Sequence, residues 1–162
     1  MKQQQEAPLH HEILAFRDRF RTLTLATTSA NQQPEASVAP FVISDHGNIC
    51  VFISELAQHT RNLLNGSKAS LLLVADEADS RNLFARQRLT LRASAFEIQR
   101  SAPDWHSIMS QFRQRFDGTI DILKQLPDFH LFGFAVNSAN YVQGFGQAFE
   151  LDQDLRPLQL EQ

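Results

Sequence analysis

Asp128 and His130 are the pair of residues whose types and spacing best suit cofactor chemistry. They lie two residues apart in a predicted strand, so both side chains are expected on one face of it. A carboxylate can hold an imidazole in one tautomer and raise its basicity, which would support a metal ligand. The alternative is structural, because a lone histidine on a strand more often satisfies local hydrogen bonds.

Four other histidines and the single cysteine have simpler interpretations. We expect His46 in a turn and His106 on a solvated helix face. His10 and His11 are expected on a mobile N-terminal end, from which they could reach a partner subunit. Cys50 lies in the apolar run at residues 49–53 and is expected to be a small buried hydrophobic residue.

Several classes of function are disfavoured by composition. The sequence has no His/Cys/Asp cluster with zinc spacing, no P-loop and no Gly-Xaa-Ser-Xaa-Gly motif. A net charge of -3 gives no strong field for nucleic acid, and no apolar run approaches the ~20 residues of a membrane span. With no signal-peptide pattern at the N-terminus, we expect a soluble cytoplasmic protein.

The first half of the chain reads as a helix followed by strands. Apolar residues at helical spacing predict an N-terminal helix at residues 8–20. Ser54 is expected to cap a short helix that ends at Asn65 and Gly66. Alternation and turn residues predict five strands, at residues 22–28, 35–43, 49–53, 69–75 and 89–98.

In the second half, a capping box at residues 101–104 should begin an amphipathic helix that extends to Phe116. A short helix at residues 119–126 follows, and two closing strands, 129–136 and 141–151, are expected to meet at a turn over residues 137–140. Seven strands with helices at the margins predict an α+β protein, mainly β, built on a small antiparallel barrel. We expect one domain over residues 1–162 with its core at about 16–151.

Three blocks of sequence carry a family resemblance: residues 54–63, residues 82–91, and residues 126–131 followed by Gly144-Phe145-Gly146. Together they resemble the haem-utilisation (HugZ/HutZ-type) family of the pyridoxamine 5'-phosphate oxidase-like, FMN-binding split-barrel superfamily. The resemblance extends from about Phe16 to Leu151. It implies a split β-barrel, a homodimer, and the binding and degradation of haem with release of iron.

The resemblance also implies roles for individual residues. The histidine at the position of His59 lies near the subunit interface in that family, and Arg88 and Asp128 match residues of the haem region. An arginine can pair with a haem propionate, and His130 is a further candidate beside Asp128. The structural alternatives are an ion pair for Arg88, a turn and strand-entry role for Asp128, and interface hydrogen bonds for His59.

One departure from the family concerns the iron ligand. Better-known haem-binding members supply an axial imidazole from a segment beyond the last strand, whereas this sequence has no histidine after Leu151. We therefore assign no metal ligand from the sequence. Another histidine could replace it, haem could bind weakly or elsewhere, or the activity could be lost.

Flavin is the alternative cofactor. Where flavin-binding relatives have an Arg-Lys pair for the flavin phosphate, this chain has Gln58 and His59. Thr60, Arg61 and Asn62, with the helix N-terminus, could still bind the phosphate. The predicted function is haem binding at a dimer cleft with possible oxidative degradation. An FMN-dependent oxidoreductase and a non-catalytic haem-binding or storage protein are the alternatives.

Homodimerisation has a second argument from composition. Thirteen phenylalanines in 162 residues exceed what one small core readily buries, and a two-fold interface is the commonest way to cover the surplus.

Overall fold

A computed structural model describes residues 3–158 of the chain. Its helices and strands follow one another in the order that the sequence predicts, with two 3-10 turns added before the fifth strand. The elements are α1 (Gln3–Asp18), β1 (Thr22–Thr28), β2 (Pro34–Ile43), β3 (Ile49–Ser54), α2 (Gln58–Asn65), β4 (Lys68–Val74), η1 (Glu77–Asp79), η2 (Leu83–Ala85), β5 (Arg88–Ile98), α3 (Trp105–Phe116), α4 (Thr119–Leu123), β6 (Phe129–Gly144) and β7 (Gln147–Leu151).

The strands form one antiparallel sheet that closes into a barrel. Its order is β3-β2-β1-β4-β5-β6-β7, and an additional pairing of β3 with β6 completes a ring of six strands. Strand β7 extends from β6 outside this ring. The predicted α+β class and the antiparallel split barrel with peripheral helices are therefore confirmed.

Alternation of side chains fills the barrel. In β1, Leu23, Leu25 and Thr27 are buried while their neighbours are not, as expected for a strand with one face on the core. Helix α1 adds Phe16, whose ring meets that of Tyr141 edge to face at 5.6 Å. A second apolar cluster lies under α3, where its buried face packs against the outside of β2, β3 and β6.

The closing strands differ from the prediction. Residues 137–140 form no turn, and β6 continues through them as a strand of 16 residues. Ala139 pairs with Leu91 and is fully buried, so sheet pairing outweighs the local turn preference of the polar residues around it. A bulge opposite Arg92 and Ala93 absorbs the irregularity. The turn lies instead before β7, where Gly146 has a φ of +67°.

Helix ends differ in smaller ways. Ala57, not Ser54, caps α2, and no side chain caps α2 or α3. The Ser54 hydroxyl instead donates to Asp128, at 2.6 Å, and accepts the Leu56 N–H. Helix α1 starts earlier than expected, at Gln3, and α4 ends at Leu123.

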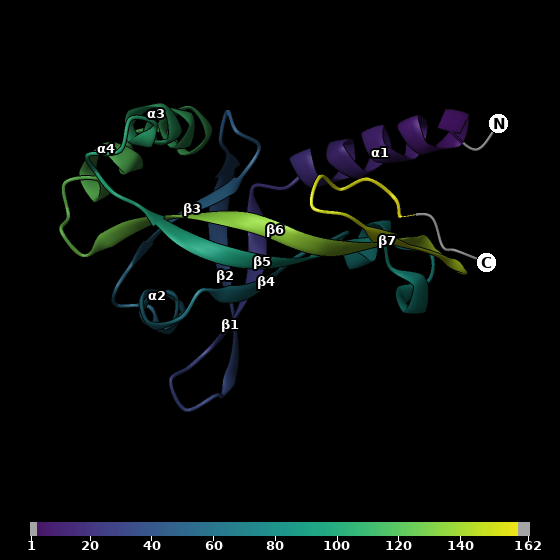
Figure 1. The fold of residues 1–162 in the computed structure, drawn as a ribbon, viewed down its shortest axis with the longest axis horizontal. Helices are drawn as coiled ribbons and strands as arrows, with labels where there is room; N and C mark the ends of the chain where they lie inside the picture. Colours follow the sequence, from purple (N-terminus) through teal and green to yellow (C-terminus); the bar gives the residue numbers. More distant parts are fainter. Residues whose placement is uncertain (1–2, 159–162) are drawn as a thin grey trace.

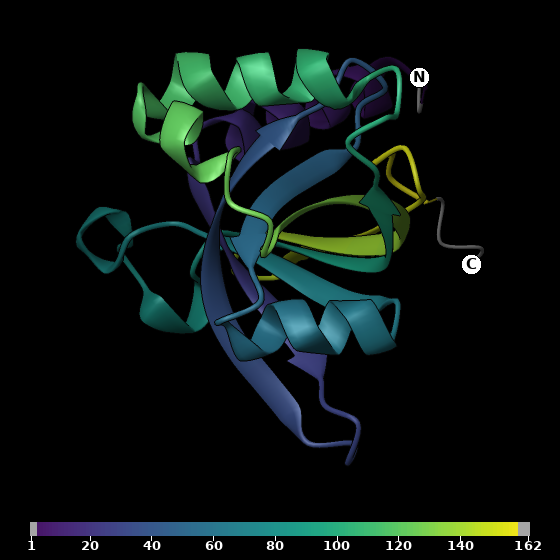
Figure 2. The same cartoon turned by 90° about the vertical axis from the view of Figure 1, so that its left-hand side faces the viewer.

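The barrel has two distinct ends. Helices α2, α3 and α4 gather at one end, and the turns η1 and η2 with strand β7 lie at the other (Figure 1). Figure 2 looks at the barrel from the first end, with α3 and α4 on one side of the ring and α2 on the opposite side. We call these the α2 end and the β7 end.

The segment after β7 folds back along α1. Leu155, with a φ of +61°, is 5% exposed and belongs to the barrel core. Its carbonyl oxygen lies 3.0 Å from His10 Nδ1. The last four residues of the histidine-free C-terminal segment, 159–162, lie outside the described part. No helix within residues 3–158 is long and apolar enough to cross a membrane.

Candidate functional site

The predicted site residues separate into two groups in one chain. The first group contains His59, Thr60, Arg61 and Asn62, which lie on α2. His130 lies at the same end of the barrel, because it precedes Leu131, which pairs with Ile98 at the end of β5. Arg88 begins β5 at the opposite end. Arg88 and Glu97, which contacts His130, lie nine residues apart on β5, or about 30 Å along the strand. One chain alone does not bring them together.

Asp128 precedes β6, and its side chain contacts the last residue of β3, Ser54. Its carboxylate accepts the Ser54 hydroxyl at 2.6 Å, and its backbone carbonyl accepts the Glu55 N–H at 2.9 Å. The described contacts of the His130 ring are with other carboxylates. Asp128 therefore fixes the entry to β6, and its expected part in orienting an imidazole stays a prediction.

His130 lies between two glutamates. Nδ1 is 2.6 Å from Glu97 Oε1, and Nε2 is 2.6 Å from Glu55 Oε1. Desolvation lowers the pKa of His130, but the hydrogen bonds and charges of Glu97 and Glu55 outweigh it and raise the pKa above its ordinary value. With both nitrogens engaged, His130 holds three segments together, and it could bind a metal only by giving up one glutamate.

His59 has the opposite character. It is half-buried at the start of α2, and desolvation by burial lowers its pKa, which favours the neutral form of the ring. No hydrogen bond to the ring contributes to that shift. A neutral imidazole whose nitrogens are not engaged is the form that binds a metal.

The predicted flavin-phosphate residues bind mainly to the protein itself. The Arg61 guanidinium donates to the backbone carbonyls of Glu55, at 2.6 Å, and Leu56, at 3.1 Å. Asn62 is buried and donates to Thr27 and Glu35. The Thr60 hydroxyl, also buried, has no hydrogen-bond partner within residues 3–158. Thr60 is therefore the buried member of this set whose hydroxyl has no hydrogen-bond partner among the described residues.

Arg88 lies beside a cavity at the β7 end. Its Nη1 donates to the Arg86 carbonyl at 2.9 Å, and Arg86 lines a cavity of about 370 Å³ together with Arg19 and Arg81. We call this the arginine cavity. The rest of its lining is Ala75, Asp79, Ser80, Asn82, Ala85, Gln87, Gln143, Gly144 and Phe145.

One large exposed apolar side chain lines the arginine cavity, and another precedes the lining residue Ala85 in the chain. Phe145, in its lining, is 75% exposed, and Phe84, in η2, is 93% exposed. Three arginines with adjacent aromatic rings suit a flat ligand that carries carboxylates. Phe84, Arg86 and Phe145 fall within the sequence blocks that carry the family resemblance, but the sequence interpretation gave none of the cavity-lining residues a ligand-binding role.

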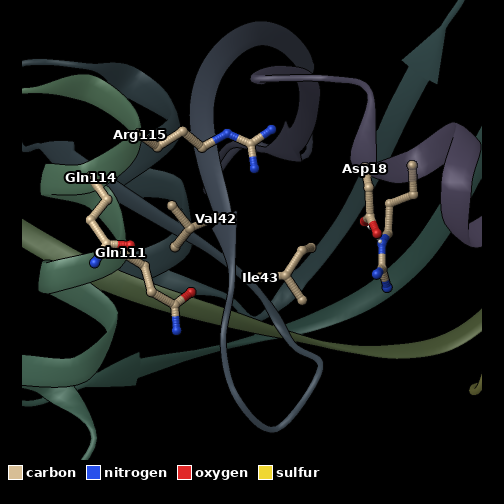
Figure 3. Close-up of a pocket in the computed structure, with 7 residues that line it drawn as sticks. Asp18, Val42, Ile43, Gln111, Gln114 and Arg115 are labelled. Atoms are coloured by element: carbon tan, nitrogen blue, oxygen red, sulfur yellow. Dashed lines mark hydrogen bonds and ion pairs between the residues drawn. The ribbon is translucent and has the colours of Figure 1, made fainter.

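Another, more open cavity of about 600 Å³ lies between the end of α1, strand β2 and helix α3. Figure 3 shows Arg115 of α3 on one side, Asp18 of α1 on the other, and Val42 of β2 between them. None of the predicted site residues lines it.

The remaining candidates have structural surroundings. His10 and His11 lie within α1 rather than on a mobile end, and His11 Nδ1 is 2.7 Å from the Ala7 carbonyl. Cys50 is fully buried, and desolvation raises the pKa of its thiol to about 12. Among residues 3–158, no group of three His, Cys, Asp or Glu residues is arranged to hold a metal.

Comparison with known proteins identifies relatives of this fold. A family model described as pyridoxamine 5'-phosphate oxidase matches residues 9–143. Haem oxygenase HutZ of Vibrio cholerae is 40% identical over 146 residues, which are 90% of this chain and 82% of that protein.

Two solved structures are similar as well. A crystal structure of HutZ from Vibrio cholerae, described there as a haem storage protein, has a TM-score of 0.71 and 41% identity, covering 76% of this chain and 86% of that one. The crystal structure of ChuZ from Campylobacter jejuni has a TM-score of 0.83 and 27% identity. That similarity covers 93% of this chain but 62% of ChuZ.

Proposed function

Since the chain belongs to the pyridoxamine 5'-phosphate oxidase family, in the haem-utilisation branch that includes HutZ, we propose that it binds haem as its substrate or cargo. The observation that carries this proposal is the 40% identity to a haem oxygenase over 90% of the chain. The arginine cavity and the neutral His59 are the structural features that support it.

The arginine cavity suits the carboxylate edge of haem. Arginine binds a carboxylate through two parallel hydrogen bonds, and here Arg19, Arg81 and Arg86 surround one cavity with Arg88 beside it. The exposed rings of Phe84 and Phe145 can cover part of an apolar macrocycle. We therefore place the haem propionates at the β7 end.

No histidine lines the arginine cavity, so an iron ligand must come from elsewhere. His59 is the best candidate, because burial favours the neutral form of its ring and the ring makes no hydrogen bond within residues 3–158, whereas both nitrogens of His130 contact glutamates. In one chain, α2 and the arginine cavity are at opposite ends of the barrel. We therefore propose a homodimer in which the α2 end of one copy meets the β7 end of the other.

Haem iron with oxygen and a reductant would supply the ring-opening chemistry, and this chain's residues would bind and orient the ring. The printed descriptions of HutZ include both a haem oxygenase and a haem storage protein. We propose oxidative degradation as the activity, with storage as the alternative.

A haem titration tests the binding proposal. Ferric haem should give a Soret band with a 1:1 endpoint per chain. Arg88→Ala should weaken binding roughly tenfold, the loss of one charge-assisted contact. Arg92→Ala is a matched control, because Arg92 is exposed on the same strand and reaches only Ser138 at 3.4 Å. No Soret band, or equal loss in both variants, would contradict the proposal.

Two further measurements separate the alternatives. Light scattering should give a dimer, and a monomer at micromolar concentration would remove the two-copy site. Adding a reductant in air to the haem complex should abolish the Soret band and release iron. A stable band under those conditions would indicate storage.

FMN binding is a second candidate, favoured by the family match and by the unpartnered Thr60 hydroxyl at the start of α2. Arg61 weakens this reading, because its guanidinium already binds two backbone carbonyls. Protein purified with a yellow chromophore that absorbs near ~450 nm, in place of a haem response, would favour the flavin function.

A further inference from the structure

Two glutamines form part of the wall of the arginine cavity, and both belong to a partly buried hydrogen-bond network. Gln87 Nε2 donates to the Tyr141 hydroxyl at 2.5 Å, and that hydroxyl donates to Glu12 Oε1 at 2.9 Å. Gln143 Nε2 donates to both carboxylate oxygens of Glu12, at 2.9 and 3.0 Å. Helix α1 and strand β6 therefore meet at one carboxylate, and Gln87, just before β5, reaches it through Tyr141.

The chemistry of Glu12 determines which way both amides face. Gln143 Nε2 lies within hydrogen-bond distance of both Glu12 oxygens, so Gln143 presents its NH2 group to this carboxyl group. Burial raises the pKa of Tyr141 to about 12, so its hydroxyl keeps its proton and donates it to Glu12. The same hydroxyl oxygen can then only accept from Gln87, which fixes the second NH2 group.

The carbonyl oxygens of the two amides are left for a ligand. Gln87 and Gln143 both line the arginine cavity. Within residues 3–158, the buried side-chain atoms that lack a hydrogen-bond partner do not include either Oε1. The wall thus offers two hydrogen-bond acceptors next to the guanidinium groups of Arg19 and Arg81. The Arg86 guanidinium also lines the cavity, but it already donates through Nε to the Ala75 carbonyl and through Nη1 to Glu77. A ligand that satisfies all of them carries N–H donors as well as anionic groups.

We propose that Glu12, acting through Tyr141, fixes Gln87 and Gln143 as acceptors, and that the arginine cavity thereby selects the lactam end of a ring-opened tetrapyrrole over a closed porphyrin. A lactam presents an N–H donor that matches the glutamine oxygens and a carbonyl that matches an arginine. A closed porphyrin has carboxylates but no N–H group on its outer edge. Glu12 is a positioning residue in this arrangement.

This inference rests on the proposed function, because it takes the arginine cavity as the tetrapyrrole site. It also predicts which tetrapyrrole the site prefers: the ring-opened product should bind more tightly than a closed ring that lacks iron. A reaction that consumes the open-chain product would therefore have to draw it from a complex with this protein.

The test compares biliverdin with metal-free protoporphyrin IX. Both carry two propionates and neither needs an iron ligand, so their difference in affinity reports the lactam ends. Fluorescence quenching should show the wild-type protein binding biliverdin about tenfold more tightly, the value of one to two hydrogen bonds. Glu12→Gln lets Gln143 turn its NH2 group outwards, and should reduce this ratio roughly tenfold through weaker biliverdin binding.

Glu150→Gln is the matched control, because Glu150 is exposed and accepts one amide hydrogen bond, from Asn140 at 3.0 Å, away from the cavity lining. If Glu12→Gln does not fold, Gln143→Leu removes one acceptor without touching the bond between Tyr141 and Glu12, and should lower biliverdin affinity alone.

Three outcomes would overturn the inference: a wild-type preference for protoporphyrin, no binding of biliverdin, or an unchanged ratio in a folded Glu12→Gln variant. A ferric haem titration run alongside separates these failures from that of the proposed function. Normal haem binding with an unchanged ratio refutes the role of Glu12 only.

Discussion

The His130 contacts predict a specific dependence of stability on pH. The perturbation is His130→Gln, which leaves a neutral side chain able to donate to one carboxylate. In the wild-type protein the protonated ring contacts Glu55 and Glu97, at 2.6 Å each. Replacing it removes the positive charge between two glutamates that lie on different segments of the chain.

The magnitude follows from the exposure of the partners. Hydrogen bonds to charged groups contribute ~1.5–3 kcal/mol, whereas exposed ion pairs contribute about 0.2–1 kcal/mol. Glu55 is 49% exposed and Glu97 is 32% exposed, which places these contacts near the lower range. Two such contacts lead us to expect that His130→Gln reduces the free energy of unfolding by about 0.4–2 kcal/mol at pH 5.5.

The sign of the pH effect follows from the raised pKa of His130. Folding favours the protonated ring, so the contribution is complete below the unfolded pKa of about 6.5 and is lost as pH rises through the higher folded pKa. The wild-type and variant proteins should therefore differ in stability at pH 5.5 and converge at pH 9.

Urea unfolding at both pH values and one fixed protein concentration measures this difference. His106→Gln serves as the control, because His106 is exposed on α3. The reasoning would be refuted if the difference in unfolding free energy between the wild-type protein and His130→Gln were equal at the two pH values. It would also be refuted if His106→Gln showed the same pH-dependent difference.

Three other predictions follow from individual environments. His59→Ala should remove the imidazole signature from the absorption and electron paramagnetic resonance spectra of the ferric haem complex; an unaltered spectrum would exclude His59 as the ligand. Gly133→Ala should lower the free energy of unfolding by about 1 kcal/mol, because its Cβ would lie 2.5 Å from the Phe96 ring. Gly118→Ala is the control, because its Cβ would have no atom within 4 Å, and thermal denaturation should show no loss of stability for it. Cys50, with a thiol pKa raised to about 12 by burial, should react with a thiol reagent at pH 8 only as fast as the protein unfolds; complete reaction within seconds of mixing would contradict its burial.

Elements with strong local signals could be predicted from the sequence alone. The apolar spacing after Trp105 defines α3 through Phe116, and β-branched alternation defines β1. Three blocks in order were enough for the family. These signals are local, because a helix face or a strand face repeats over neighbouring residues.

The β6 strand shows where local signals fail. Residues 137–140 favour a turn in isolation, yet their pairing with β5 keeps them extended. The positive φ needed for the actual turn is at Gly146, where glycine tolerates it. Pairing energy comes from a strand more than 40 positions earlier, which a local window does not include.

For the candidate site, the sequence identified Arg88, Asp128 and His59 through the family resemblance, but the partners of these side chains depend on tertiary structure. His130 contacts glutamates 33 and 75 positions away, not the neighbouring Asp128. Tyr141 reaches Glu12 across 129 positions. Pairing of β6 with β3 and β5 in the closed barrel brings His130 to its two glutamates, and packing of α1 against the barrel brings Glu12 to Tyr141. No spacing along the sequence encodes either set of contacts.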